Sequence, residues 1–377
     1  MQIILVPGKV WNEKSLETCW AMRRAVGTTA AATTCALCYE AWRLRPQWHK
    51  TGEMPAHGSR DTWLYRRCGD VAVFLATAAV LPISKILNRT EVQDMHHLRN
   101  AWERRHERPL LTVANHHGCI DDPLLFPLLM PNSLGLPLLT SANRTRWSLC
   151  KHDICYKNEV LAAFFGAGQT LPIVRGEGVE QTALKVFGSK LVPGNWVHIF
   201  PEGRIWQLSV VGGRPELYDG TPYETAGEWQ QPYRPYLRWG VGKIVADAPI
   251  SPTIVPFYHT GMADVQPQSV RTERLLSPWP RSGNTIVVRA GEPFDVDDLL
   301  HAHRQRVSAL RARARDVGTA VDAIESQVQE AEHALYSAIT KRVEQRLRAL
   351  ETKVRSDLGL RELTQQQRGR QVPRPME

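Results

Sequence analysis

The residues with the clearest chemical potential lie in the stretch Thr112–Pro123, which reads TVANHHGCIDDP. His116 and Asp121 are five positions apart across a predicted turn, so the carboxylate can reach one imidazole nitrogen. The other nitrogen then faces outward and can accept a proton as a general base. The pair corresponds to the histidine and the aspartate of a catalytic triad, with a substrate hydroxyl in place of the enzyme's serine.

The doubled histidines and aspartates leave other interpretations open. His117 and Asp122 have the same spacing as His116 and Asp121 and could form the pair instead. All four side chains are of types that bind metals, although no third ligand cluster with familiar spacing accompanies them. They could also form a capped turn with buried histidines, because Asp122 and Pro123 suit the N-cap and first position of a helix.

Two further strand ends carry residues suited to a phosphate group. The strand-like run Leu171–Val174 is followed by Arg175, and the run Trp196–Phe200 leads into Pro-Glu-Gly-Arg. In that second segment Arg204 supplies positive charge, and Gly203 lets the backbone approach a ligand closely. Ligands of open α/β sheets bind outside the carboxyl ends of the strands. We therefore expect one phosphate site at that edge, beside the His-x4-Asp turn.

Short strands alternate with helices from about residue 100 to 300, which indicates an α/β domain. The expected strands are Leu110–Ala114, Leu171–Val174, Trp196–Phe200, Ile250–Tyr258 and Thr285–Arg289. The main amphipathic segments between them are Gly178–Leu191 and Arg238–Ala248. The polar stretch Asn88–Arg108 is predicted to form a solvated helix face.

The composition narrows the possible functions less than the motifs do. The chain has 377 residues, 43% of them hydrophobic, which is enough for a sizeable core. Lys and Arg (47) outnumber Asp and Glu (38), and the resulting net charge of +9 suits nucleic acid, anionic lipid or a phosphorylated substrate. No basic-aromatic module typical of nucleic-acid binding appears. The seven scattered cysteines disfavour a disulfide-stapled secreted domain.

We divide the chain into five parts. They are an N-terminal extension (1–62) whose arginines and scarce acids are compatible with mitochondrial import, an interfacial membrane anchor region (63–100), the α/β domain (101–300), a long heptad-patterned helix (301–361) and a mobile tail (362–377). The apolar run Val71–Ile83 has 13 residues, too few to span a bilayer of roughly 30 Å, so it is expected to enter one leaflet or to be a core helix. The aromatic, Gly/Pro-rich insertion 206–238 is expected to be a membrane-facing lid.

The segment after residue 300 carries apolar residues at heptad spacing from Val307 to Leu335. One unbroken helix of this region would be about 75–90 Å long, more than the domain could cover. We expect a break near Gly318 or after Leu335, or pairing with a second chain. The alternatives are packing of the first half on the chain's own domain, a homodimer through the heptad seam, and a helix lying on lipid.

The motifs, taken in order, resemble the glycerophospholipid acyltransferase family, and most closely its tafazzin branch. The similar stretches are TVANHHGCIDDP (112–123), DICYKNE (153–159), VRGEGVEQ (174–181), NWVHIFPEGR (195–204), LRWGVGKIVA (237–246) and PFYHTGMADV (256–265). They cover most of residues 110–300. Arg204 departs from the pattern, because lysine is common at that position.

The resemblance implies a glycerol-3-phosphate acyltransferase-like fold with a mixed central sheet flanked by helices. It implies His116 as general base and Asp121 as its partner, since Asn-His identifies the first histidine. The residues implied to bind substrate are Asn115, Arg175, Glu202, Gly203, Arg204 and, near the acyl chain, Pro256. No metal or other cofactor is implied. Backbone N–H groups near Gly118 or Gly203 are expected to stabilise the oxyanion.

The implied activity is a coenzyme-A-independent transfer of acyl groups between phospholipids and lysophospholipids. It would remodel cardiolipin by acylating monolysocardiolipin, on a mitochondrial membrane, from a monotopic enzyme facing the intermembrane space. The alternatives are an acyl-CoA-dependent lysophospholipid acyltransferase with the same site, and a catalytically silent membrane scaffold. The intact His-x4-Asp and FPEG motifs disfavour the scaffold.

Overall fold

The computed structural model describes residues 63–123, 125, 145–205, 207, 209–211, 214–216, 237–269, 274–317 and 321–359. The N-terminal extension, almost all of the 206–238 insertion and the tail lie outside these residues. Mitochondrial import, the lid and the mobile tail therefore stay predictions.

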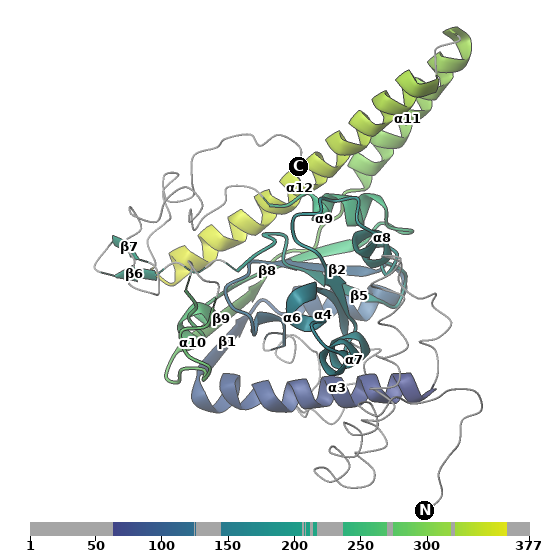
Figure 1. Cartoon of the computed structure of the whole chain (residues 1–377). Helices are drawn as coiled ribbons and strands as arrows, with labels where there is room; N and C mark the ends of the chain where they lie inside the picture. Colours follow the sequence, from purple (N-terminus) through teal and green to yellow (C-terminus); the bar gives the residue numbers. More distant parts are fainter. Residues whose placement is uncertain are drawn as a thin grey trace, which may run out of the picture.

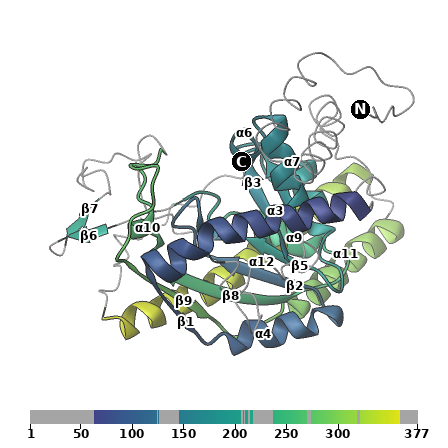
Figure 2. The ribbon, with the colours of Figure 1, turned by 90° about the horizontal axis from the view of Figure 1, so that it is seen from below.

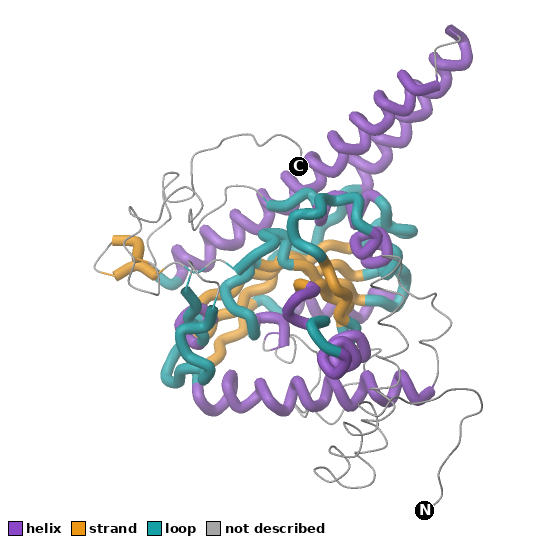
Figure 3. The backbone as a smooth tube through the Cα atoms, in the orientation of Figure 1, coloured by secondary structure: helices purple, strands orange, loops and turns teal. Residues whose placement is uncertain are grey.

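A seven-stranded mixed sheet forms the centre of the molecule (Figures 1 and 3). Its order is β1 (Arg89–Gln93), β9 (Thr285–Ala290), β8 (Thr253–Thr260), β2 (Leu110–Ala114), β5 (Trp196–Ile199), β3 (Arg146–Lys151) and β4 (Thr170–Ile173). The five strands from β8 to β4 are parallel, whereas β9 runs antiparallel to β8 and parallel to β1. The carboxyl ends of five strands therefore meet at one edge, and the predicted mixed sheet is confirmed.

The five strands expected from the sequence are all present; β2 has the expected bounds, and the ends of the other four are shifted. β8 begins at Thr253 rather than Ile250, and β4 ends at Ile173. Two strands were missed. β1 lies in the stretch predicted to be a helix face; it is an edge strand paired only with β9, so polar side chains are tolerated along it. β3 buries the polar residues Arg146 and Ser148, whereas its apolar residues are only partly buried, so it lacks the apolar run that marked the other strands.

Helices cover both faces of the sheet. They are α3 (Trp63–Pro82), η2 (Ile83–Leu87), α4 (His96–Glu103), η3 (Arg104–His106), α6 (His152–Cys155), α7 (Glu159–Ala167), α8 (Thr182–Gly188), α9 (Gly240–Ala246), α10 (Met262–Val265), α11 (Asp297–Val317) and α12 (Val321–Asp357). A small hairpin, β6 (Ser209–Val211) and β7 (Arg214–Glu216), stands apart. Strand β2 divides its side chains between the two faces: Leu110 packs with the α3 side and Leu111 with the α9 and α12 side.

The apolar run predicted at Val71–Ile83 belongs to a longer helix. Helix α3 crosses one face of the sheet (Figure 2) and buries Val73 and Val80 in its core. With η2 it continues to Leu87, and the segment Gly69–Leu87 is long and apolar enough to cross a membrane. The 13-residue run thus lies within a longer helical segment that has the length and composition of a membrane span, and its insertion into one leaflet stays a prediction.

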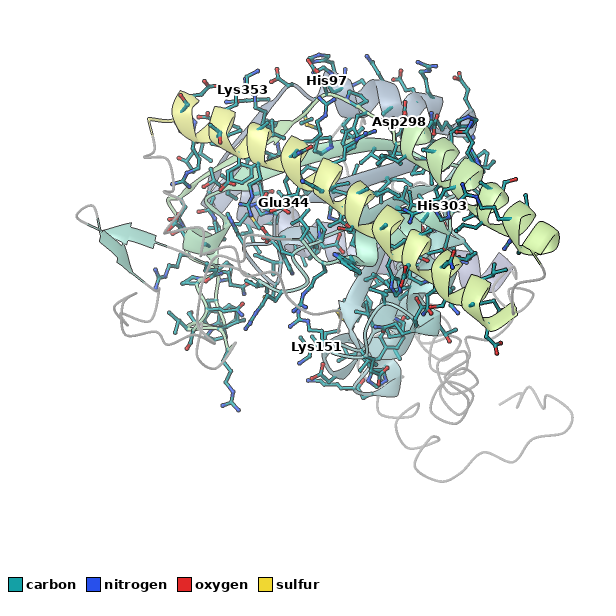
Figure 4. The ribbon with its side chains drawn as sticks, turned by 90° about the horizontal axis from the view of Figure 1, so that it is seen from above. His97, Lys151, Asp298, His303, Glu344 and Lys353 are labelled. Atoms are coloured by element: carbon teal, nitrogen blue, oxygen red, sulfur yellow. A yellow bond between two sulfur atoms is a disulfide. The ribbon has the colours of Figure 1, made fainter. Side chains whose placement is uncertain are left out.

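The C-terminal region forms two helices that lie side by side (Figure 1). Helix α11 ends at Val317 and α12 begins at Val321, as expected for a break near Gly318. Arg342 of α12 binds Asp298 at the start of α11 (Figure 4). The part that packs on the domain is α12 from Ala331 to Val354, and not the first half of the C-terminal region, which was one of the expected alternatives. Homodimerisation through the heptad seam stays a prediction.

One disulfide joins the end of β3 to α6. Cys150 and Cys155 form it, with 6.2 Å between their Cα atoms. A single bond of this kind is not the framework that stabilises small secreted domains.

The closest approach of α9 to α12 is at Gly242. A Cβ atom there would lie 2.1 Å from the carbonyl oxygen of Tyr336 and 2.8 Å from Oγ1 of Thr340. Gly242→Ala must therefore push the helices apart, and we expect it to lower the free energy of unfolding by about 1–3 kcal/mol. Chemical denaturation measures this. Gly240→Ala is the matched control, because its Cβ would meet only Leu184 methyl groups at 3.8 Å or more; equal effects of the two would contradict the prediction.

Candidate active site

The buried carboxylate of Asp121 organises the turn that follows β2. Its Oδ2 atom accepts hydrogen bonds from His116 Nδ1 (3.0 Å) and from the backbone N–H groups of His117 (2.6 Å) and Gly118 (2.8 Å). Burial by itself raises the pKa of Asp121, but the nearby His259 and the hydrogen bond from His116 outweigh it and hold that pKa below its usual value. Asp121 is therefore a carboxylate that fixes the tautomer of His116.

The His116 ring is held in one orientation by residues at the end of β5. It stacks on Phe200, with ring centroids 4.1 Å apart and planes 14° from parallel. Its backbone N–H donates to Oε2 of Glu202 over 2.9 Å. The side chain is 16% exposed, and no described residue hydrogen-bonds Nε2. That nitrogen is available to a substrate hydroxyl.

The alternative pair, His117 with Asp122, does not form. Asp122 binds the Arg146 guanidinium through both carboxylate oxygens and also accepts a hydrogen bond from Ser148. Its charge is therefore compensated by Arg146 of β3. His117 faces Asn115 Nδ2 at 3.2 Å, and burial together with nearby His259 lowers its pKa to about 3. Among the described residues, no group of three or more His, Cys, Asp or Glu side chains could hold a metal ion.

A second histidine, His259 near the carboxyl end of β8, completes the surroundings of Asp121. Its side chain is fully buried, and its Nε2 lies 2.8 Å from the Asn115 carbonyl oxygen and 3.5 Å from Asp121 Oδ2. Both neighbours are acceptors, so we assign the proton to Nε2. Burial lowers the pKa of His259, which agrees with a neutral ring. His259 lies within the motif 256–265, but nothing in that motif predicts this role.

Asn115 joins β2 to β8. Its amide donates to the His259 carbonyl oxygen (2.8 Å) and accepts from the His259 N–H (2.9 Å). The side chain is buried, and these bonds use one donor and one acceptor of the amide. Asn115 thus positions the catalytic turn, and its predicted contact with substrate stays a prediction.

The Phe-Pro-Glu-Gly-Arg segment forms a tight turn after β5. Gly203 has φ +73°, and a Cβ there would lie 3.0 Å from Arg238 Cγ, so the position suits glycine. Its N–H donates to the Phe200 carbonyl oxygen, and the Gly118 N–H donates to Asp121. The N–H groups of Gly118 and Gly203 themselves are therefore already used, and stabilisation of the oxyanion by other N–H groups near them stays a prediction.

The remaining predicted residues lie at different places in the sheet. Arg204 directly follows the Gly203 turn, whereas exposed Arg175 follows β4, at the far edge of the sheet. Pro256 lies buried within β8, opposite Val113 of β2, three residues before His259. The structure thus brings His116, Asp121, Asn115, Glu202 and Gly203 together and leaves Arg175 and Pro256 outside this cluster.

Two polar contacts join the catalytic turn to the segment after α10. Buried Gln207 donates to the carbonyl oxygens of His117 (2.6 Å) and Gln266 (3.0 Å). Cys119 donates to Gln266 Oε1 over 3.0 Å, and burial raises the pKa of its thiol to about 11. Cys119 is therefore a thiol at neutral pH and a poor nucleophile.

Comparison with known proteins shows which proteins this chain is similar to. Residues 89–260, from β1 to the end of β8, match the Acyltransferase family. The chain is 30% identical over 264 residues to Tafazzin of Drosophila melanogaster (67% of this chain, 61% of that protein) and 28% over 266 residues to Tafazzin of Saccharomyces cerevisiae (60% and 64%). It is 28% identical over 230 residues to N-acylphosphatidylethanolamine synthase of Arabidopsis thaliana (60% and 71%).

The chain carries an acyltransferase domain and is tafazzin-like. It spans between 61% and 71% of the length of these three relatives. A solved structure, the 1-acyl-sn-glycerophosphate acyltransferase PlsC of Thermotoga maritima, is 12% identical with a TM-score of 0.35, covering 83% of this chain and 95% of that one.

Glu202 gives a test of the turn by pH. Burial raises its pKa to about 8, from the ordinary 4.5, so folded Glu202 keeps its proton where the unfolded chain has lost it. Its contribution to stability is therefore complete below pH 4.5 and is lost as the pH rises towards 8. Glu202→Gln keeps an acceptor for the His116 N–H but cannot ionise. We therefore expect the melting temperature of this variant, measured relative to that of the unmodified chain, to be higher at pH 8 than at pH 5.

Glu202→Ala is the control for that experiment. It removes the ionisable group and the acceptor together, so it should be destabilised relative to Glu202→Gln at both pH values. A Glu202→Gln variant whose melting temperature runs parallel to that of the unmodified chain from pH 5 to pH 8 would contradict the assignment.

Proposed function

We propose that this chain transfers an acyl group from a phospholipid to the free hydroxyl of a lysophospholipid, with His116 as general base. The observation that carries the proposal is the bond from His116 Nδ1 to buried Asp121, which leaves Nε2 as an acceptor in a partly exposed position. The acyltransferase domain and the tafazzin relatives support the same class of reaction.

In the proposed reaction, Nε2 of His116 takes the proton of the free hydroxyl of the lysophospholipid. The oxygen of that hydroxyl attacks the ester carbonyl of the donor lipid. Asp121 stabilises the imidazolium that forms. When the tetrahedral intermediate collapses, the imidazolium returns the proton to the leaving oxygen of the donor, which becomes the new lysophospholipid. The acyl group thus moves from the donor lipid to the acceptor, and the proton moves from the acceptor to the donor, without a cofactor.

We further propose that the reaction is independent of coenzyme A and that it remodels cardiolipin through monolysocardiolipin, on a mitochondrial membrane facing the intermembrane space. The relatives named Tafazzin support this choice, and the net charge of +9 suits an anionic lipid. The nearest rival is an acyl-CoA-dependent enzyme with the same base. The Arabidopsis relative favours a second candidate, in which the acceptor is the amine of phosphatidylethanolamine.

One assay separates these reactions. Purified protein is given phosphatidylcholine with a labelled acyl chain, together with monolysocardiolipin or phosphatidylethanolamine, with and without coenzyme A. Labelled cardiolipin formed without coenzyme A supports the proposal. Label that reaches cardiolipin only when coenzyme A is added supports the rival, and label in an amide of phosphatidylethanolamine supports the second candidate.

The same assay tests the base. We expect His116→Ala to lower kcat by about 10²–10⁴-fold, because it removes the proton acceptor. His117→Ala is the matched control: it changes the neighbouring histidine, whose ring faces Asn115 and not Asp121, and should be much milder. Equal losses from both, restored by added zinc, would favour a metal site instead.

His259 is expected to act as a positioning residue. Its Nε2–H binds the carbonyl oxygen of the residue before His116 and lies 3.5 Å from Asp121 Oδ2. His259→Leu should lower kcat about ten-fold or more with little change in KM, since the base is misplaced while the lipid surfaces remain. His259→Gln offers a donor near the same place and should recover much of the loss. Variants that are equally inactive although both are folded would contradict this role.

A further inference from the structure

Helix α3 and η2 present a stripe of exposed apolar residues on the side away from the sheet. The exposed positions are Val71, Leu75, Ala79, Pro82 and Ile86, at spacings of three or four residues, so they share one face of the helix. Leu75 is 53% exposed and Ile86 is 79% exposed. The opposite face, which includes Val73 and Val80, is buried against the domain. The helix therefore lies along the protein with its apolar outer face uncovered by described residues.

A second exposed apolar group comes from a distant part of the chain, the loop 274–283 after α10. Trp279 is 78% exposed, and Leu275 and Leu276 are 39% and 42% exposed. A fully exposed tryptophan is unusual on a soluble surface, but tryptophan is enriched where a protein meets the headgroup region of a membrane.

Hydrogen bonds join this loop to the end of η2. Asn88 Nδ2 donates to the carbonyl oxygens of Ile83 (2.9 Å) and Arg281 (3.0 Å), and the Gly283 N–H donates to the carbonyl oxygen of Leu87 (2.7 Å). The loop and the exposed end of η2 are thus neighbours held by buried Asn88. We call the exposed residues of these two segments, 82–90 and 274–285, the apolar corner.

All the charged residues of the two segments that form the apolar corner are basic. The two segments contain four basic residues, Lys85, Arg89, Arg274 and Arg281, and no acidic residue. Arg89 also binds Glu91 (3.0 Å), just beyond the first segment. Exposed apolar side chains bordered by basic ones complement a membrane surface with anionic lipid.

We propose that the apolar corner docks on an anionic phospholipid surface, with Trp279 as its anchor. The inference rests on the proposed lipid function. It adds a second membrane contact to that of α3, made by the loop near the C-terminal end of the domain. It also gives that function a geometry. Loop 274–283 pairs with the segment after α10, where the Leu276 N–H donates to the Pro267 carbonyl oxygen (3.0 Å). Gln207 links Gln266 and Gln268 of that segment to the carbonyl oxygen of His117. Docking the corner would therefore bring the catalytic turn to the lipid surface that supplies its substrates.

Flotation of the purified full-length protein with vesicles tests the proposal without any activity measurement. The vesicles contain either phosphatidylcholine alone or phosphatidylcholine with phosphatidylglycerol. We expect Trp279→Ser to reduce partitioning into both by about ten-fold, since a large apolar side chain is no longer buried. Lys85→Gln with Arg281→Gln should reduce partitioning into the anionic vesicles alone, by about five-fold for each charge.

Ile250→Ser is the matched control. Ile250 is 43% exposed and precedes β8, at the amino ends of the parallel strands, away from the catalytic turn. Its substitution should leave partitioning unchanged. If Trp279→Ser floats like the unmodified protein, the proposal is overturned. It is also overturned if light scattering shows that Trp279→Ser converts a dimer to a monomer without changing flotation, because the corner would then bind a second copy.

This result is independent of the acyl-transfer assay. A chain that floats as expected but transfers no acyl group would keep the docking surface and contradict the proposed reaction. A chain that is active on detergent-dispersed lipid but floats equally with and without Trp279 would keep the reaction and lose the docking surface.

Discussion

The constraint on which the site depends is the burial of one ionised carboxylate, that of Asp121. A charge removed from water must be compensated by donors, and here Oδ2 alone receives an imidazole and two backbone N–H groups. Those two backbone donors force the chain after β2 to curl around the carboxylate. The same curl places the His116 ring beside it, so stabilising the charge and orienting the base are one structural event.

The turn is held from the neighbouring strands on both sides. From β5, Phe200 stacks on the His116 ring and Glu202 accepts its backbone N–H. From β8, His259 exchanges three hydrogen bonds with Asn115. Because β8, β2 and β5 are adjacent and parallel, their carboxyl ends deliver all these groups to one place. The mixed sheet is therefore what allows residues more than a hundred positions apart to fix one imidazole.

The pairing of His116 with Asp121 could be predicted from the sequence because it is local, five residues across one turn. The strands that the sequence revealed were also those with strong apolar runs. Three features could not be found in this way. The partner of Asp122 is Arg146, from a strand with too few apolar residues to be recognised, and without that partner the choice between the two His-x4-Asp pairs stayed open. His259 carries no local signal, since its role depends on β8 pairing with β2. The heptad seam was compatible with packing on the chain's own domain, a dimer or a helix lying on lipid, and the pairing of α11 with α12 could not be foreseen because it is a tertiary contact.

The loop that carries Trp279 starts at the same edge of the sheet as the catalytic turn, and this has a consequence for how lipid reaches His116. Gln207 bridges the turn to Gln266 and Gln268 through three hydrogen bonds, and the Leu276 N–H of the loop binds the Pro267 carbonyl oxygen of the same segment. The turn and the loop therefore cannot shift independently without breaking polar contacts. A force on the loop, such as insertion of its apolar residues into a membrane, is therefore transmitted to the backbone of His117. His116 lies one residue away, and its ring is stacked on Phe200, so the base and the membrane-facing loop are expected to form one rigid unit. If the loop docks as proposed, the proposed acyl transfer therefore takes place next to the membrane surface.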